Sequence, residues 1–290
     1  MPELPEVETV RRGLVPALEG ATITRAEARR PDLRFALPAD LAERLEGNRV
    51  LSVDRRAKYL MIGLATEETL VVHLGMTGRF TVRREEEGNT EVPGAFTHGV
   101  TPTEAHEHIL LRAEGGAAGP VRIGFVDPRR FGYWDMVETA GIARARWFEG
   151  MGPEPLDDAW DGAALHAALR GRRSPIKTAL LDQRVVAGLG NIYVCEALHR
   201  TGISPRRQAG NVGRGRADAL AGAVKTVLAD AIQAGGSTLR DYADANGERG
   251  AFQHAFTAYG REGEACGCGA RIRRIVQSGR STFYCSRCQR

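Results

Sequence analysis

Apolar and polar residues alternate along the first half of the chain as they do in half-buried β-strands. The clearest runs are separated by Gly-rich or charged turns and cover residues 49–53, 70–74, 108–112 and 121–126. Long helical patterns do not alternate with these runs. The region from about Ala21 to Phe131 is therefore predicted to be a β-sandwich or barrel rather than a doubly wound sheet.

The second half of the chain has helical patterns instead. They cover residues 158–169, 175–181, 191–200 and 214–234, and Gly235-Gly236 ends the last of them. The loop at 150–155 resembles a domain boundary. The polar segment from Ser237 to His254 is long enough to be a functional loop.

A helix is also predicted at the amino terminus, where Val7, Val10 and Leu14 follow helical spacing. Pro2 suits the start of such a helix, which would explain it without chemistry. Removal of Met1 would instead leave Pro2 with a free secondary amine, which is a potential nucleophile. The two interpretations are compatible, because a helix start beside the amine disfavours its protonated form.

Charge and cysteine are concentrated at the carboxyl end. The chain of 290 residues has a net charge of +4, yet residues 260–290 carry +5 and the preceding 259 residues sum to −1. The same tail holds four of the five cysteines. With 42% apolar and 26% charged residues the composition is that of a globular protein, and no apolar run approaches the roughly 20 residues of a membrane span. A compact basic tail indicates an acidic partner.

The cysteines predict a metal site. The amino terminus has no signal-peptide pattern, so we expect a cytoplasmic protein with reduced thiols. Sixteen residues separate Cys266-Gly-Cys268 from Cys285-Ser-Arg-Cys288, a spacing typical of a zinc ribbon. One structural Zn²⁺ is the prediction, and unligated cysteines in a disordered tail are the alternative. The one-residue spacing of the first pair departs from the pattern, although Gly267 gives the backbone freedom to aim both sulfurs.

Other residues have both a functional and a structural interpretation. Asn191 follows a Gly-rich turn and suits a helix N-cap whose N–H groups could bind phosphate, but such turns are more often structural. Arg129 could pair with a base edge and Phe131 could wedge into a base stack, but a solvated basic turn is an equal alternative. His73 and His106 are lone histidines, for which a structural role is more common.

Seven motifs in order along the chain, from residue 2 to residue 290, resemble the bacterial formamidopyrimidine-DNA glycosylases, also called 8-oxoguanine-DNA glycosylases. The amino terminus is closer to this family than to the related endonuclease eight. The motifs are Pro2-Glu-Leu-Pro-Glu-Val-Glu-Thr9, Arg56-Ala-Lys-Tyr-Leu60, His73-Leu-Gly-Met-Thr-Gly78, Asp127-Pro-Arg-Arg-Phe-Gly132, Gly188-Leu-Gly-Asn-Ile-Tyr193, Tyr259-Gly-Arg-Glu-Gly-Glu264 and Arg280-Ser-Thr-Phe-Tyr-Cys285.

The resemblance implies a bifunctional base-excision-repair enzyme, a DNA glycosylase that is also an abasic-site lyase. Pro2 matches the amine that attacks the sugar C1′ and forms a Schiff base. Glu3 matches the proton donor and Glu6 a supporting carboxylate. Lys58 matches the lysine assigned to β-elimination. Arg280 matches the zinc-finger arginine that grips the phosphates beside the lesion and is associated with δ-elimination.

The resemblance also implies DNA contacts. The damaged base must be flipped out of the duplex. Met76, Arg129 and Phe131 match the residues that fill the vacated stack, and the segment from Ser237 to His254 aligns with the loop that closes over the lesion. Six further residues lie at or near phosphate-contact positions, and they are His73, His106, Arg172, Lys177, Asn191 and Tyr259.

The implied fold is an α+β multidomain protein: an N-terminal β-sandwich, a helical helix-two-turn-helix domain and a C-terminal zinc-finger hairpin. We expect the catalytic sandwich at residues 1–133, a linker at 134–155, the helix-two-turn-helix domain with the lesion-capping loop at 156–255, and the zinc finger at 256–290. The expected partner is double-stranded DNA with oxidised purines or abasic sites. A monomer without membrane contact is expected.

Two other functions remain open on the sequence alone. One is an endonuclease-eight-like glycosylase that prefers oxidised pyrimidines. The other is a zinc-finger protein that binds damaged DNA without catalysis, for which a free Pro2 amine is not needed.

Overall fold

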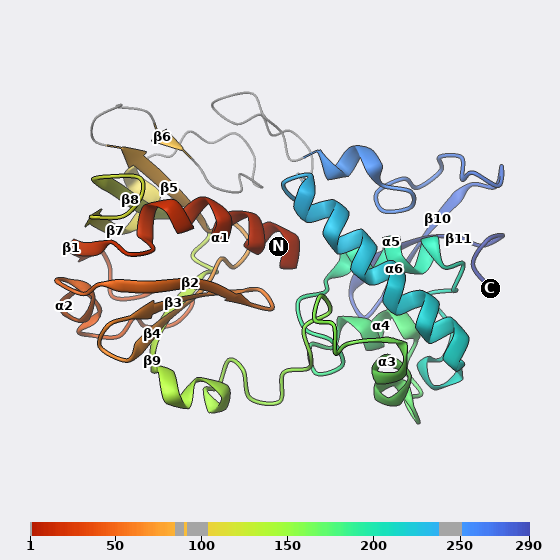
Figure 1. Ribbon diagram of the computed structural model, residues 1–290. Coiled ribbons are helices and arrows are strands. Elements are labelled where there is room, and N and C mark those ends of the chain that lie inside the picture. Colours follow the sequence, from red (N-terminus) through yellow and green to blue (C-terminus); the bar gives the residue numbers. More distant parts are fainter. Residues whose placement is uncertain (1, 85–89, 92–103, 238–250) are drawn as a thin grey trace. The chain divides into compact units, whose positions relative to one another are not determined.

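The computed structural model describes residues 2–84, 90–91, 104–237 and 251–290. The chain forms two compact units (Figure 1). The first comprises Met1–Glu149 and Ala234–Ala251, and the second comprises Gly150–Gln233 and Phe252–Arg290. The first unit is thus discontinuous in sequence. Most of the predicted lesion-capping loop, residues 238–250, lies outside the described residues.

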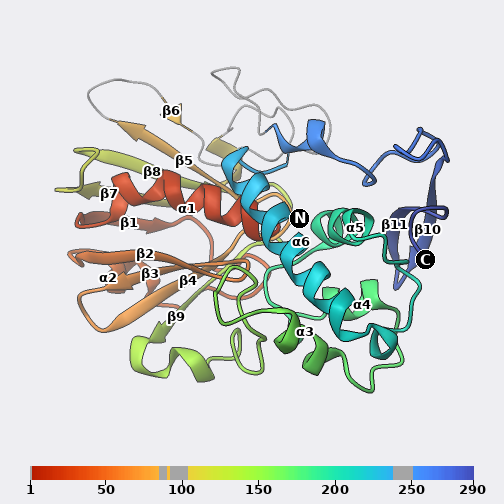
Figure 2. The same ribbon diagram turned by 45° about the vertical axis from the view of Figure 1, so that its right-hand side comes forward.

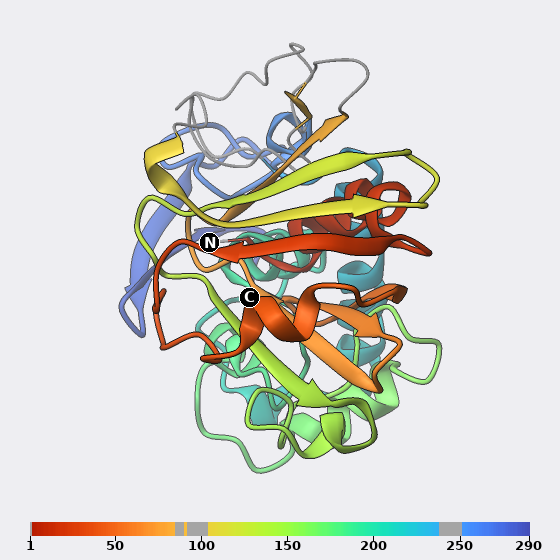
Figure 3. The same ribbon diagram turned by 90° about the vertical axis from the view of Figure 1, so that its left-hand side faces the viewer.

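The first unit contains two antiparallel sheets, seen as separate layers in Figure 3. One sheet has the order β1 (Thr22–Ala28), β7 (Glu107–Glu114), β8 (Val121–Val126), β5 (Arg79–Arg84) and β6 (Thr90–Glu91). The other has the order β2 (Val50–Arg56), β3 (Tyr59–Leu64), β4 (Glu68–His73) and β9 (Tyr133–Glu138). The predicted β-sandwich is therefore confirmed.

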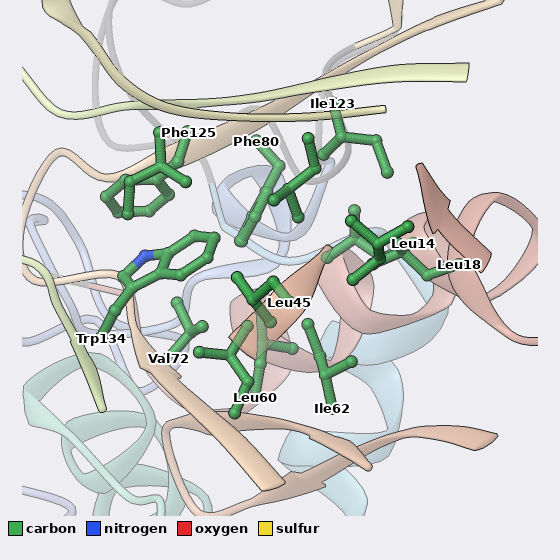
Figure 4. Packing of buried hydrophobic residues seen from close by; sticks show 14 of the residues in the cluster. Leu14, Leu18, Leu45, Leu60, Ile62, Val72, Phe80, Ile123, Phe125 and Trp134 are labelled. Carbon is green, nitrogen blue, oxygen red and sulfur yellow. The ribbon is translucent and has the colours of Figure 1, made fainter. Parts of the chain in front are cut away.

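The core lies between the two sheets. Along β3 every second residue is buried, as the two-residue period of a strand with one inward face requires. Phe80, Phe125 and Trp134 pack with ring centroids 5.3 to 5.9 Å apart. In Figure 4 side chains from both sheets point toward one another, and Leu14 and Leu18 of the first helix extend the same core.

Helix α1 (Leu4–Leu18) forms where the apolar spacing predicted it, and Val7, Val10 and Leu14 are buried. Pro5 lies in its first turn, where a missing backbone N–H costs nothing. The helix packs on β2, β3 and β5. Three short elements complete the unit, and they are α2 (Leu41–Leu45) and the 3-10 helices η1 (Glu104–His106) and η2 (Thr139–Arg144).

The second unit is helical with an appended hairpin (Figure 2). Helices α3 and α5 pack on α6, and α5 also packs on β11. Cys195 of α5 is buried, as expected. The elements are α3 (Gly162–Leu169), α4 (Ile176–Leu181), α5 (Asn191–Arg200), η3 (Ala209–Asn211), α6 (Arg214–Gln233), η4 (Phe252–Ala255), β10 (Ile272–Gln277) and β11 (Arg280–Cys285).

The hairpin turn places Arg280 at the start of β11. Gln277 pairs with Arg280, so only Ser278 and Gly279 connect the strands. Both have positive φ, 49° and 72°, which suits the right-handed twist of the strands in a two-residue turn.

Two details differ from the sequence expectations. Strand β9 and helix η2 occupy part of the stretch 134–155 that was expected to be a linker, because β9 completes the four-stranded sheet. Asn191 is not an N-cap: the extended cap residue of α5 is Gly190, and Asn191 is the first helical residue. The side chain of Asn191 is instead used in a contact described below.

Candidate functional site

The amino terminus is fixed by two buried glutamates. Pro2, Glu3 and Glu6 are all buried. Oε2 of Glu6 accepts the backbone N–H of Glu3 at 2.8 Å, and the Glu3 side chain accepts the backbone N–H of Glu6. This reciprocal capping box satisfies two N–H groups that a helix start leaves without partners. It also fixes the peptide that follows Pro2.

The other oxygen of Glu6 binds a distant segment. Oε1 accepts the backbone N–H of Ser237 at 2.8 Å and its hydroxyl at 2.9 Å. Ser237 is buried and follows Gly235-Gly236 at the end of α6. One carboxylate therefore ties the start of α1 to the first residue of the predicted lesion-capping loop. No sequence pattern predicts this role of Ser237.

Lys58 lies in the two-residue turn between β2 and β3, where Arg56 pairs with Tyr59. The positive φ of 54° at Ala57 makes this turn possible. Lys58 is only 7% exposed, so its side chain is not extended into solvent.

His73 ends β4 with its ring packed between aromatic neighbours. Its ring is stacked on Tyr133 with centroids 4.9 Å apart, and Tyr59 is 5.1 Å away. Nδ1 accepts the backbone N–H of Gly75 at 2.9 Å. Burial, with smaller contributions from the charges of Lys58 and Arg34, lowers the pKa of His73 to about 4. The ring is therefore neutral at physiological pH, and its hydrogen is on Nε2.

Two turns present the three residues expected to fill a base stack. Met76 and Phe131 are 38% and 39% exposed, which is unusual for large apolar side chains. The Arg129 guanidinium lies 4.7 Å from the centre of the Phe131 ring. Gly75 has a φ of 65°, and a Cβ there would lie 2.2 Å from the Phe131 carbonyl carbon, so the turns pack backbone to backbone.

A buried carboxylate, Asp127, joins these two turns. It accepts the Thr77 hydroxyl at 2.5 Å and the Gly132 N–H at 2.7 Å. The Thr77 hydroxyl oxygen in turn accepts the N–H of Arg129 at 3.3 Å. Asp127 also donates its N–H to the carbonyl of His106, which lies in η1. Asp127 begins one of the seven motifs, but its sequence context does not predict this role.

The second unit contains a basic pocket of about 360 Å³. Arg172, which was predicted, and Arg184, which was not, both bind Asp182. Hydrogen bonding to Arg184, with a smaller contribution from Arg172, lowers the pKa of Asp182 to about 2. The other residues that line the pocket come from α4 and its flanks and from the hairpin, and they are Ser174, Thr178, Ala179, Leu181, Ser278 and Arg280.

Two further predicted phosphate contacts lie near α4 and α5. The side-chain amide of Asn191 donates to the Ser281 carbonyl at 2.8 Å, which connects the start of α5 to β11 beside Arg280. Lys177 of α4 is 0% exposed, so it differs from the other predicted contacts, which the structure leaves at least partly exposed.

Tyr259 is positioned by a third buried carboxylate, Glu196 of α5. Glu196 is 0% exposed and accepts four hydrogen bonds, from the N–H and hydroxyl of Thr257 and from the N–H groups of Ala258 and Tyr259, at 2.7 to 2.9 Å. The only sequence signal for this role was a glutamate inside the apolar run of a predicted helix.

The four tail cysteines converge. Their sulfurs all lie within 4.8 Å of one another, with 3.8 Å between Cys266 and Cys288 and 3.6 Å between Cys268 and Cys285. Tetrahedral zinc with bonds of about 2.3 Å places sulfurs about 3.8 Å apart, so the arrangement fits this metal.

Three family models match the chain in succession. They describe the formamidopyrimidine-DNA glycosylase N-terminal domain at residues 1–134, the formamidopyrimidine-DNA glycosylase H2TH domain at 151–243, and a zinc finger found in FPG and IleRS at 268–290. The last match supports one structural zinc ion on the four-cysteine cluster.

Relatives match over the whole chain. The formamidopyrimidine-DNA glycosylase of Phenylobacterium zucineum is 55% identical over 293 residues and that of Caulobacter vibrioides 52% over 292, each covering 100% of both chains. A Lactococcus lactis Fpg bound to DNA with an abasic site has a TM-score of 0.84 at 32% identity and covers 99% of both chains. MutM bound to DNA containing carbocyclic 8-oxo-G has the same TM-score and identity and covers 100% of both.

A membrane span is not found in the part of the chain that the structure describes: none of its helices is both long enough and apolar enough.

Replacing Glu6 with Gln is expected to lower the free energy of unfolding by about 2–3 kcal/mol, because an amide cannot accept hydrogen bonds at both of its ends. Ser237→Ala removes only one of the three hydrogen bonds and should cost about 1 kcal/mol. Urea unfolding would measure both changes. Glu114→Gln, at an exposed position of β7, is the control. Equal values for all three variants would contradict this role of Glu6.

The low pKa of His73 makes stability depend on pH. The folded state favours the neutral ring, so its contribution is complete above the ordinary pKa of 6.5 and is lost as pH falls toward about 4. His73→Gln should remove up to about 3 kcal/mol of this dependence. The unfolding free energies of parent and variant at pH 4.5, 5.5 and 7 measure this loss. If the two change in parallel with pH, the ring titrates normally and the low pKa of His73 is contradicted.

Proposed function

The chain belongs to the formamidopyrimidine-DNA glycosylase family, and from this membership we infer that it is a base-excision-repair glycosylase that removes oxidised purines from DNA and nicks the strand at the resulting abasic site. The observation that carries the residue assignments is the buried amino terminus, where two glutamates hold the chain immediately after Pro2. The roles that follow are proposals for this chain.

We propose that Pro2 is the nucleophile once Met1 is removed. Its nitrogen forms a bond to C1′ of the damaged nucleotide while the bond from C1′ to the base breaks. Glu3 donates a proton during this step, and the amine gives up its own. Opening of the sugar ring leaves a cationic iminium, which accepts electrons during elimination.

Glu6 is assigned a positioning role and does not take part in bond making or breaking. Both of its oxygens already accept hydrogen bonds from Glu3 and Ser237, so it fixes the backbone beside Pro2. Lys58 is assigned to β-elimination, in which the proton at C2′ is removed and the 3′ phosphate leaves. Arg280 is assigned to the flanking phosphates and to δ-elimination, in which the 5′ phosphate leaves. A cation offsets the charge on each departing phosphate.

DNA recognition is assigned to the exposed turns. Met76 and Phe131 would occupy the space left by the flipped base, and Arg129 would face the orphaned base. The arginine is already placed against the Phe131 ring. His73 would donate its Nε2 hydrogen to a phosphate as a neutral group. His106, Arg172, Asn191 and Tyr259 are assigned to other phosphates, and the buried Lys177 stays a prediction from the resemblance.

Zinc has no step in this chemistry. When bound, it cross-links the two cysteine pairs and so orders the hairpin that carries Arg280. The partner of the chain is proposed to be double-stranded DNA with oxidised purines or abasic sites. The relatives named above include proteins crystallised with DNA of this kind. We propose that the protein acts as a monomer in the cytoplasm.

Borohydride reduction tests the nucleophile. The full-length protein with 8-oxoguanine opposite cytosine should give a covalent adduct, because borohydride reduces the iminium to a stable amine. Pro2→Gly should lose at least 100-fold in trapping rate, whereas Pro120→Gly, in a loop of the same unit, should trap as the parent does. Equal trapping by Pro2→Gly would overturn the assignment.

The two alternative functions predict different results. Tight binding of lesion DNA without any adduct, with Met1 retained in the mass spectrum, would indicate a binding protein. Faster excision of thymine glycol than of 8-oxoguanine would indicate an endonuclease-eight-like enzyme.

Arg280→Gln is expected to weaken DNA binding, to reduce its salt dependence by about one phosphate contact, and to shift products from β,δ- to β-elimination. Gel analysis of the cleaved strand ends measures the shift. Arg273→Gln removes a charge from another exposed position, on β10, and is the control. An unchanged product ratio for Arg280→Gln would contradict its role in the second elimination.

A further inference from the structure

Arg55, near the end of β2, connects the first helix to the turn that carries Lys58. Its Nε donates to Oε2 of Glu8 at 3.3 Å, and its Nη1 donates to the Ala57 carbonyl at 2.9 Å. The Arg55 side chain is 11% exposed and that of Glu8 is 12% exposed. The guanidinium is therefore a largely buried bridge between α1 and the turn from β2 to β3, both of which belong to the first unit.

The Ala57 carbonyl belongs to the peptide bond that precedes Lys58. Ala57 has a φ of 54°, in the left-handed region that residues other than glycine rarely adopt. Such a conformation persists only when the surrounding structure holds it. The hydrogen bond from Arg55 restrains this peptide, and the pairing of Arg56 with Tyr59 closes the turn. The backbone that carries Lys58 is thus held by a side chain as well as by the strand ladder.

Glu8 fixes the other end of the bridge. Its carboxylate also accepts hydrogen bonds from Nε and Nη2 of Arg11, at 3.0 and 2.8 Å, and from Nε of Arg12 at 3.0 Å. Burial raises the pKa of Glu8, but the hydrogen bonds from Arg11 and Arg12 outweigh burial and hold this pKa below its ordinary value. An ionised acceptor strengthens the hydrogen bond from Arg55. Because Glu8 lies on α1, which begins two residues after Pro2, the bridge joins the Lys58 turn to the helix that follows the proposed nucleophile.

We propose that Arg55 is a positioning residue for Lys58: it holds the peptide before the lysine and attaches this turn to α1. Arg55 itself makes and breaks no bond with DNA. Its effect on rate rests on the role in β-elimination proposed for Lys58, whereas its effect on the position of the lysine does not. A displaced lysine slows elimination, because proton transfer and charge stabilisation both require a defined geometry.

Single-turnover nicking of DNA with a preformed abasic site tests the effect on rate. Arg55→Met keeps an unbranched side chain without donors and should slow nicking about 10- to 100-fold, while borohydride trapping at Pro2 stays near the parent rate. Arg55→Lys can reach only one of the two acceptors and should recover part of the loss. Arg11→Met is the control and should nick at the parent rate, because the hydrogen bonds of Arg11 go to Glu8 and to the Val53 carbonyl.

A double-mutant cycle separates an action through Lys58 from a general loss of structure. In a Lys58→Gln background, Arg55→Met should slow nicking little further, because the residue that it positions is already absent. If Lys58→Gln alone slows nicking, then a parent rate in Arg55→Met contradicts the proposal, as do losses that multiply in the double variant.

Nuclear magnetic resonance reports the position of the lysine without catalysis. The sequence contains three lysines, Lys58, Lys177 and Lys225, so protein labelled with ¹³C at lysine Cε gives three signals, and Lys58→Gln identifies the one from Lys58. This signal should shift in Arg55→Met and stay in place in Arg11→Met, while the other two signals stay in both variants.

An unshifted Lys58 signal in Arg55→Met would overturn the proposal. A shifted signal together with parent-rate nicking by Lys58→Gln would support the positioning by Arg55 and contradict the role of Lys58 in elimination. Failure of the proposal and failure of the assigned function are therefore distinguishable.

Discussion

The geometry of the amino terminus depends on one buried carboxylate. Glu6 accepts hydrogen bonds on both oxygens, from the residue after Pro2 and from Ser237. A carboxylate buried without partners is costly, so the folded state is strongly biased toward the arrangement that supplies all three donors. A reactive amine needs such a constraint, since a shift of about 1 Å in a reacting group can cost two orders of magnitude in rate.

Two other buried carboxylates of the described residues hold backbone in the same way. Asp127 joins the two turns that present Met76 and Phe131, and Glu196 gathers the N–H groups of residues 257–259. Glu6 and Glu196 lie on helices and Asp127 directly follows β8, and each holds irregular backbone, which has no ladder or helix to satisfy its own N–H groups. Loops can then carry recognition residues in defined positions without being part of a sheet or helix.

The local sequence pattern was sufficient to predict the helices and strands but not the contacts of these buried carboxylates. The sandwich strands, the helices at α3 to α6 and the zinc hairpin follow from hydrophobic period, Gly-containing turns and cysteine spacing, and the motifs brought the family and the candidate residues. The roles of Ser237, Asp127 and Glu196 were missed because their partners are distant in sequence: Ser237 is 231 residues from Glu6, and Asp127 is 50 from Thr77. A one-residue error at Asn191 has a simpler origin, because Gly190 adopts the extended cap conformation without needing a side-chain acceptor.

The contact between Glu6 and Ser237 can form only late during synthesis on the ribosome. Glu6 emerges among the first residues, yet its second set of donors is not made until residue 237 of 290 has been translated. By then the chain has already produced α3 to α6 of the other unit. The final geometry of the amino terminus is thus completed only late in translation, which leaves most of translation for the proposed removal of Met1.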